Sequence, residues 1–202
     1  MKGLIFIPDI TGFTNFVKQI EIDLGVSITR DLLTEIIDNN DLGFELLEIE
    51  GDAVLFYKEG KPVPLPQIFL CIKKMYQAFT RKYEYLRLKY NIRSELTLKF
   101  ILHYGDMNCY YLKGFKKLYG QTIIESHRLL KNGSDHASYI LITEDYTDAL
   151  LSENGDCIQR NWDLTYRSSQ FFSDLREISY YLFHCAAKGT VPVNIPYKRI
   201  SA

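Results

Sequence analysis

Hydrophobic positions near the start of the chain predict one strand followed by two helices. Residues 3–8 form a continuous apolar run, a pattern typical of a central strand that is buried on both faces. Thr11 and Thr14 are candidate caps for the helix that follows, and Gly25 is expected to interrupt that helix. A second helix is expected from Ser27, because apolar residues recur on one helical face from there.

A hairpin and a long helix are expected next. Residues 44–49 and 53–57 are short apolar segments joined by Glu50-Gly51-Asp52, which predicts two antiparallel strands with a tight turn. Residues 65–90 carry apolar side chains at alternating steps of three and four, the period of an amphipathic helix. The aromatic side chains of this helix are interpreted as core packing.

The second half of the chain is expected to add three strands and two helical segments. They are a strand over 96–102 that ends at 103–105, a polar and aromatic connector, a helix over 121–131, a strand over 139–143, a helical turn or two over 145–151, and a strand over 178–185. This order predicts an α+β fold: a mixed, mostly antiparallel sheet with helices packed on one face. A single domain over 1–202 is expected, with 152–177 as an unassigned insertion and 186–202 as a tail.

Composition narrows the classes of function. The 202 residues include 24 Lys+Arg and 25 Asp+Glu, for a formal net charge of −1, so no basic surface for nucleic acid is indicated. No apolar run approaches the roughly 20 residues that cross a bilayer, so neither a membrane anchor nor a secretory signal is expected. The four cysteines are far apart in sequence, which favours reduced thiols in a cytoplasmic protein. Small ligands and protein partners are the favoured partner classes.

Two aspartates are candidate metal ligands. Asp9 follows the first strand and Asp52 lies at the tip of the predicted hairpin. If the first strand pairs beside the hairpin, both carboxylates lie at one edge, and with the carbonyl of Ile10 they form an all-oxygen site suited to Mg²⁺ or Mn²⁺ carrying a polyphosphate. The alternative is structural: Asp9 caps a helix and Asp52 makes a turn.

Backbone amides at the start of the next helix are a candidate anion cradle beside that site. They belong to Gly12, Phe13 and Thr14. No GxGxxG or P-loop pattern follows the first strand, which excludes the usual dinucleotide-binding and NTPase sites.

Three motifs, in order along the chain, resemble a known family. They are Asp9-Ile10-Thr11-Gly12-Phe13-Thr14, Glu48-Ile49-Glu50-Gly51-Asp52-Ala53-Val54, and His103-Tyr104-Gly105 followed by residues 118–128. Together they are similar to motifs of the catalytic domain of class III nucleotidyl (adenylate/guanylate) cyclases, a resemblance that covers about residues 1–145. The stretches EIEGDAVLFY and HRLLKN resemble, more narrowly, an uncharacterised bacterial branch of cyclase-like domains.

The resemblance implies a site and a partner. Asp9 and Asp52 take the positions of the two aspartates that hold two divalent ions, Mg²⁺ or Mn²⁺, against the triphosphate of ATP or GTP. Arg128 takes the position of the arginine that steadies the phosphate under attack, and its alternative role is a helix-surface salt bridge. A homodimer is implied as well, because in the family the metal aspartates of one subunit face the arginine-bearing helix of the other.

The chain also departs from the family. The Asn that stabilises the transition state, four residues before the arginine, is Ile124 here, and losing one such donor costs roughly 10²- to 10³-fold in rate. The base-specificity positions hold Glu48, which favours guanine, and Lys117, which fits neither base pattern and is a candidate ion-pair partner of Glu48. The late phosphate-binding lysine stays unassigned between Lys188 and a tyrosine at 180 or 181.

Three hypotheses follow. The first is a divalent-metal-dependent nucleotide-binding signalling domain that forms a cyclic nucleotide from an NTP with low activity. The second is a non-catalytic relative that keeps the fold as a sensor or dimerisation module. The third is a structural α+β domain whose motifs arise by chance. The Asp9 and Asp52 pair favours retained metal binding, whereas Ile124 and Lys117 favour the second hypothesis.

Overall fold

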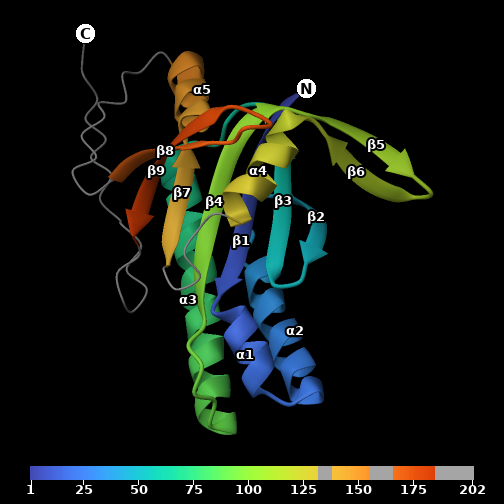
Figure 1. Ribbon diagram of the computed structural model, residues 1–202, viewed down its shortest axis with the longest axis vertical. Coiled ribbons are helices and arrows are strands. Elements are labelled where there is room, and N and C mark those ends of the chain that lie inside the picture. The colour runs from blue at the N-terminus through green and yellow to red at the C-terminus, as the bar shows by residue number, and fades with distance from the viewer. Residues whose placement is uncertain (132–137, 155–165, 185–202) are drawn as a thin grey trace.

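A seven-stranded sheet in the order β2-β3-β1-β4-β7-β9-β8 organises the chain (Figure 1). The structure is a computed structural model that describes residues 1–131, 138–154 and 166–184. The strands are β1 (Lys2–Thr11), β2 (Glu45–Glu50), β3 (Ala53–Glu59), β4 (Thr97–Asp106), β7 (Tyr139–Thr143), β8 (Tyr166–Phe171) and β9 (Glu177–His184). All neighbouring strands of this sheet are antiparallel except β4 and β7, which are parallel. The predicted α+β class with a mostly antiparallel mixed sheet is confirmed.

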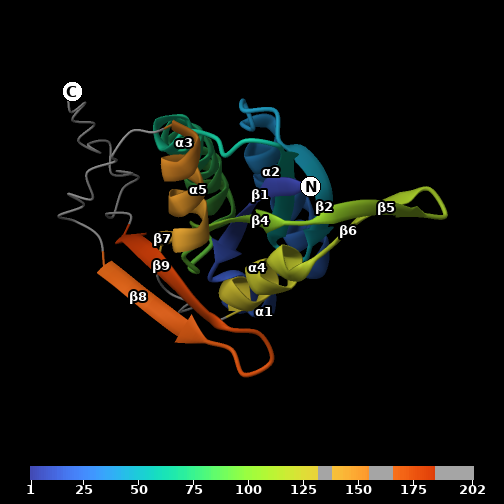
Figure 2. The same cartoon turned by 90° about the horizontal axis from the view of Figure 1, so that it is seen from above.

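Helices lie on both faces of this sheet and not on one face as the sequence predicted, because α4 (Gln121–Lys131) packs opposite the other four described helices. Those four are α1 (Phe13–Gln19), α2 (Ile22–Asp38), α3 (Leu65–Tyr90) and α5 (Glu144–Asn154). Side chains of α1, α2, α3 and α5 share one large core with the sheet. A second core lies on the other face, where Leu129 of α4 packs. Figure 2 shows α3 and α5 on one side of the sheet and α4 on the other.

The pleat of β1 and β4 decides which side chains reach the face that α4 covers. In β1, Leu4 and Phe6 belong to the large core, whereas Ile5 and Ile7 belong to the core beneath α4. Asp9 continues this odd-numbered series. Successive side chains of a strand alternate between faces, so Asp9 projects to the α4 side.

The junction between β1 and α1 differs from the sequence-based expectation. β1 extends to Thr11, so Asp9 lies inside the strand and does not cap a helix. Pro8 does not end the strand, because β1 pairs with β3 at Phe6 and again at Asp9, and Pro8 lies in the interval between. A residue without an N–H donor is tolerated at such an interruption.

The first two helices also begin and end at other residues than expected. Gly12, not Thr11 or Thr14, is the N-cap residue of α1, and no side chain caps that helix by a hydrogen bond. Its φ of 88° is a left-handed conformation that glycine adopts without strain. Gly25 is buried inside α2, which begins at Ile22 and not at Ser27. A small residue fits there because an added Cβ would lie 3.0 Å from the Ile20 side chain.

A two-stranded hairpin replaces the connector expected after β4. β5 (Asn108–Leu112) and β6 (Phe115–Tyr119) pair with each other and form a separate small sheet. Lys113 and Gly114 form the turn with φ values of 51° and 87°, the geometry of a two-residue hairpin turn that needs positive φ at both positions. This β5–β6 arm projects away from the main sheet (Figures 1 and 2).

The remaining expectations agree with the structure to different degrees. α3, α4 and β7 have the predicted bounds, and the predicted hairpin is formed by β2 and β3. α5 is longer than expected, and β8 forms within the segment left unassigned at 152–177. The tail at 186–202 lies outside the described residues, and a single domain over the whole chain stays a prediction. Within the described residues, every helix is too short or too polar to cross a membrane.

Candidate functional site

Asp9 and Asp52 come from neighbouring strands at the same end of the sheet. Asp9 of β1 is the register partner of Ala53 in β3, the residue after Asp52. The backbone N–H of Ile10 donates a hydrogen bond to the carbonyl of Asp52 at 3.3 Å. The predicted pairing of the first strand with the hairpin is therefore confirmed, and it brings the two aspartates together.

A buried lysine lies against Asp9. The Nζ atom of Lys99 in β4 is 2.9 Å from Oδ2 of Asp9, and the two residues are 6% and 8% exposed. Lys99 is also the register partner of Asp9 in the antiparallel β1–β4 pair. The same ammonium donates a hydrogen bond to the carbonyl of Leu130 in α4, at 3.3 Å. The cation beside this candidate metal ligand therefore belongs to the chain itself.

The residues around Asp9 do not fit a divalent ion in this arrangement. Ions such as Mg²⁺ and Mn²⁺ bind several oxygens at about 2 Å, and a resident ammonium repels them and uses the carboxylate lone pairs. No group of three His, Cys, Asp or Glu side chains that could hold a metal occurs within the described ranges. The side chain of Ile10 lies in the large core on the other face, so its backbone carbonyl is the only oxygen that it could offer. Metal binding by Asp9, Ile10 and Asp52 stays a prediction, and the contact of Asp9 with Lys99 argues against it.

The predicted anion cradle lies at the start of a short helix. The carbonyl of Gly12 accepts the first hydrogen bond of α1, from the N–H of Phe16 at 3.1 Å. A Cβ added at Gly12 would lie 2.3 Å from the carbonyl oxygen of Glu95, so close backbone packing already requires glycine there. Phosphate binding by Gly12, Phe13 and Thr14 stays a prediction.

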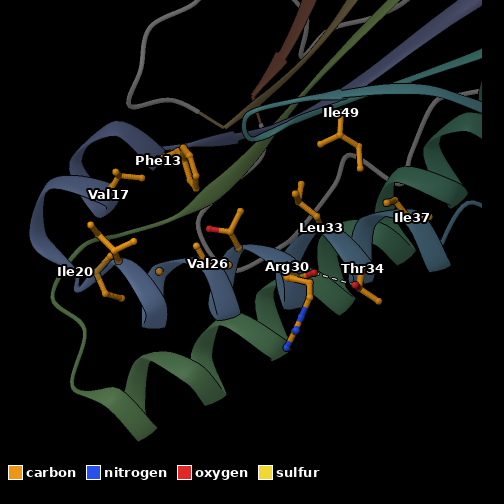
Figure 3. Close-up of a pocket in the computed structure, with 12 residues that line it drawn as sticks. Phe13, Val17, Ile20, Val26, Arg30, Leu33, Thr34, Ile37 and Ile49 are labelled. Atoms are coloured by element: carbon orange, nitrogen blue, oxygen red, sulfur yellow. Dashed lines mark hydrogen bonds between the residues drawn. The ribbon is translucent and has the colours of Figure 1, made fainter. Parts of the chain in front are cut away.

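An apolar groove opens beside these residues, between α1, α2 and β2 (Figure 3). This α1–α2 groove has a volume of about 520 Å³ and is lined by Phe13, Val17, Ile20, Ile22, Gly25, Val26, Thr29, Arg30, Leu33, Thr34, Ile37 and Ile49. Among the described residues that line the groove, Arg30 is the one with a charged side chain. The groove does not suit a triphosphate, whose charges need several cations or amide donors.

Glu48 and Lys117 form the ion pair that the sequence had left as an alternative. Lys117 Nζ lies 2.7 Å from Oε2 of Glu48, and this hydrogen bond raises the pKa of Lys117. His127 of α4 joins them, with ring nitrogens 3.9 Å from a Glu48 oxygen and 3.5 Å from a Glu50 oxygen. His127 had not been selected as a site residue, because its approach to β2 depends on how α4 packs.

Ile124 and Arg128 share the outer face of α4. They are four residues apart, and Ile124 is 51% exposed. Glu125, Ser126 and Leu129 are buried against the sheet, so neither Glu125 nor Ser126 lies on the outer face where the missing Asn would stand. Arg128 donates to Asp174 at 2.7 Å in an exposed salt bridge, the alternative role named for it. This face is turned away from Asp9 of the same chain.

The late phosphate-binding position has two candidates from the sequence, Lys188 and a tyrosine at 180 or 181. Tyr181 donates a hydrogen bond to Glu144 at 3.0 Å, which gives it a structural role in β9. Lys188 lies outside the described residues.

A buried polar network was missed by the sequence analysis. His103 in β4 is 2.9 Å from Thr143 Oγ1 through Nδ1 and 2.8 Å from Glu125 Oε2 through Nε2. Arg176 donates to both oxygens of Glu125, at 2.7 and 3.0 Å, and Gln121 donates to Oε1 at 2.8 Å. Burial by itself would raise the pKa of Glu125, but the hydrogen bonds from His103, Arg176 and Gln121 outweigh it and lower this pKa to about 2.

Residues 29–139, more than half of the chain, match the family described as "Protein of unknown function (DUF2652)". The chain belongs to the DUF2652 family. This DUF2652 protein is also 28% identical over 122 residues to an uncharacterized protein of Mycobacterium tuberculosis. That match covers 56% of each chain, so the DUF2652 protein spans about half the length of this curated relative.

Solved nucleotidyl cyclase domains have the same fold as the DUF2652 protein. The guanylyl cyclase Cya2 matches with a TM-score of 0.69 at 12% identity, covering 98% of this chain and 96% of its own. The adenylyl cyclase CyaB from P. aeruginosa matches with a TM-score of 0.61 at 16% identity, covering 94% and 97%. The catalytic core of a rhodopsin-guanylyl cyclase with converted specificity, in complex with ATPαS, has a TM-score of 0.62 at 15% identity, covering 91% and 96%. At these identities the likeness shows the fold alone.

Proposed function

We propose that this DUF2652 protein is a homodimeric, cyclase-fold sensor or dimerisation module in which the cyclisation reaction has been lost. The observation that carries the proposal is the outer face of α4. Ile124 stands on it where the resembled family has an Asn donor, and an aliphatic side chain donates no hydrogen bond to a transition state. Arg128, on the same face, is paired with Asp174 of its own chain.

Three contacts within the chain, that of Arg128 among them, support loss of catalysis. The polar groups that a cyclase would direct at a nucleotide are used here within the chain: Asp9 contacts Lys99, Glu48 contacts Lys117, and Arg128 contacts Asp174. A transition state is stabilised by groups that are preorganised and available to it. A ligand would have to compete with each of these ion pairs.

Two features support a homodimer. The first is that Ile124 and Arg128 face away from Asp9 of their own chain, so a site that combines both elements needs a second copy related by a two-fold axis. The second is the β5–β6 arm, which exposes a set of large apolar side chains: Tyr110, Tyr111, Leu112, Phe115 and Tyr119. A concentration of exposed apolar side chains on a projecting element indicates a protein contact.

A second candidate function is an NTP-binding domain with slow cyclisation. The adjacency of Asp9 and Asp52 at one end of the sheet favours it, because these residues match the metal positions of the resembled family. In that case Mg²⁺ or Mn²⁺ would accompany ATP or GTP, and catalysis would be limited by Ile124.

One product assay separates the two candidates. The purified protein is incubated with each of the four NTPs and Mn²⁺ or Mg²⁺, and cyclic products are measured by mass spectrometry beside an active class III cyclase. We expect no cyclic product above the protein-free control. A cyclic product that disappears in Asp52→Asn would overturn the proposal and establish the slow cyclase.

A further inference from the structure

The pair formed by Asp9 and Lys99 lies in the interior of the sheet, on the face that α4 covers. The two residues are directly opposite each other in the β1–β4 register, and both are more than nine-tenths buried. Ile7 and Ile101, which precede and follow them on the same face of the two strands, are almost fully buried as well. On this side the pair is therefore flanked by apolar side chains, whereas the next residues on the other side are Thr11 and Thr97.

Each member of this pair needs the other. A buried ammonium without a counter-charge is strongly unfavourable, and so is a buried carboxylate. Asp9 supplies the charge at 2.9 Å, and the Leu130 carbonyl accepts a second hydrogen bond from the ammonium at 3.3 Å. The ammonium of Lys99 therefore contacts both β1 and the last turn of α4.

We propose that the ammonium of Lys99 replaces a divalent cation at Asp9. The carboxylate that would coordinate Mg²⁺ or Mn²⁺ instead has an internal partner, so that a metal ion could bind only by displacing the buried ammonium of Lys99, which would then lose its counter-charge. This inference rests on the proposed function and deepens it, because it gives the lost cyclisation a cause that is separate from Ile124. The site at the end of β1 and β3 binds no divalent ion, since Lys99 takes its place at Asp9.

Mn²⁺ binding tests the replacement directly, without any nucleotide or product. Free Mn²⁺ is measured by electron paramagnetic resonance as it is titrated into the wild type, Asp9→Asn, Lys99→Met and Lys82→Met. Lys82→Met is the matched control, because Lys82 forms another Lys–Asp ion pair, with Asp31 at 3.2 Å, away from this site. Lys99→Met removes the ammonium but keeps an unbranched side chain of similar length.

We expect the wild type and Asp9→Asn to bind Mn²⁺ equally weakly, and Lys99→Met to bind it at least tenfold more tightly. The double variant Lys99→Met, Asp9→Asn should lose this gain, and Lys82→Met should behave as the wild type. Mn²⁺ should also raise the melting temperature of Lys99→Met and leave that of the wild type unchanged, since the ion would neutralise the orphaned carboxylate.

The proposal is overturned if the wild type binds Mn²⁺ at least tenfold more tightly than Asp9→Asn, or if Lys99→Met gains no affinity. Should either single variant fail to fold, the comparison of the wild type with the double variant Lys99→Met, Asp9→Asn, which removes both charges together, stays decisive: at least tenfold tighter Mn²⁺ binding by the wild type overturns the proposal. The result is distinguishable from that of the product assay. A wild type that forms a cyclic nucleotide without Asp9-dependent Mn²⁺ binding contradicts the proposed function alone, whereas Asp9-dependent Mn²⁺ binding without product contradicts the Lys99 inference alone.

Discussion

The imidazole of His103 lies 2.8 Å from the carboxylate of Glu125, and this contact joins β4 to α4. Both residues are at most 2% exposed. Arg176, in the turn before β9, binds the same carboxylate through two hydrogen bonds and reaches Asp145 of α5 at 2.9 Å. One buried carboxylate therefore connects the helix on one face of the sheet to strands and turns from the second half of the chain.

Replacement of Glu125 by Gln should destabilise the protein strongly. Gln keeps the volume but removes the charge that both Arg176 and His103 contact, and breaking a buried ion pair costs about 3 to 5 kcal/mol. Urea denaturation measures the change in the free energy of unfolding. Glu84→Gln is the control, because Glu84 forms an exposed pair with Arg87 at 3.1 Å within α3, where a loss below about 1 kcal/mol is expected. Equal losses in the two variants would contradict a stabilising role of the network.

The same carboxylate should make stability depend on acidic pH. The pKa of Glu125 falls from 4.5 to about 2 on folding, so the folded state favours its ionised form. The resulting stabilisation is complete above pH 4.5 and is lost as the pH falls from 4.5 towards 2. Melting temperatures of the wild type and Glu125→Gln, compared at several pH values in this window, should converge as the pH falls. Parallel curves would show that Glu125 is not the responsible group.

The β5–β6 arm should hold the homodimer together. Tyr111→Ser combined with Phe115→Ser removes two large side chains that are 68% and 72% exposed, so the fold should tolerate the change while the contact between copies is lost. Light scattering after size-exclusion chromatography, at tens of micromolar protein, should give a dimer mass for the wild type and a monomer mass for the variant. Leu88→Ser, at a 76% exposed position of α3, should stay dimeric. A monomeric wild type, or a variant that stays dimeric, would contradict the arm's role.

Gly12 should be required for packing, whatever it binds. Gly12→Ala would place a Cβ 2.3 Å from the Glu95 carbonyl oxygen at a φ of 88°, whereas Gly60, at a φ of 98°, has open space around its Cβ position. Both variants have the cost of a left-handed alanine, but only the first forces the backbone to move, which adds about 1 to 3 kcal/mol. Urea denaturation of Gly12→Ala and Gly60→Ala measures the difference. Equal losses would show that the contact with Glu95 adds nothing to the cost of the left-handed conformation.

Two obstacles to cyclisation should act together. Ile124→Asn restores a donor worth roughly 10²- to 10³-fold in rate, but it leaves Lys99 against Asp9. We therefore expect cyclic product with Mn²⁺ and an NTP only when Ile124→Asn is combined with Lys99→Met, as measured by mass spectrometry. The double variant with Arg128→Ala added serves as the control and should lose the product. Product from Ile124→Asn alone would show that Lys99 is no obstacle.

Local sequence patterns determined the elements whose stability comes from one repeating face. The apolar residues at steps of three and four predicted a helix over 65–90, and α3 has these bounds. The period is visible in the local sequence because one face of this helix is buried in the large core. The glycine turn between the strands of the β2–β3 hairpin likewise marks their ends. Asp9 and Asp52 were expected at one end of the sheet on the condition that the first strand pairs beside this hairpin, and β1 and β3 do pair in this way.

Tertiary structure alone decided which partner each polar side chain has. A period reports the face of a strand but not its register, and Lys99 meets Asp9 only because β4 pairs with β1 across about 90 residues of chain. The alternation along 96–102 predicted that Lys99 and Leu98 point to different faces of the strand. The face of Lys99 is buried because α4, which comes later in the sequence, packs on it. The ion pairs of Glu125 with Arg176 and of Arg128 with Asp174 also join residues that are far apart in the sequence. Long-range pairing is set by the free energy of the whole sheet and its two cores, and no short window of sequence contains it.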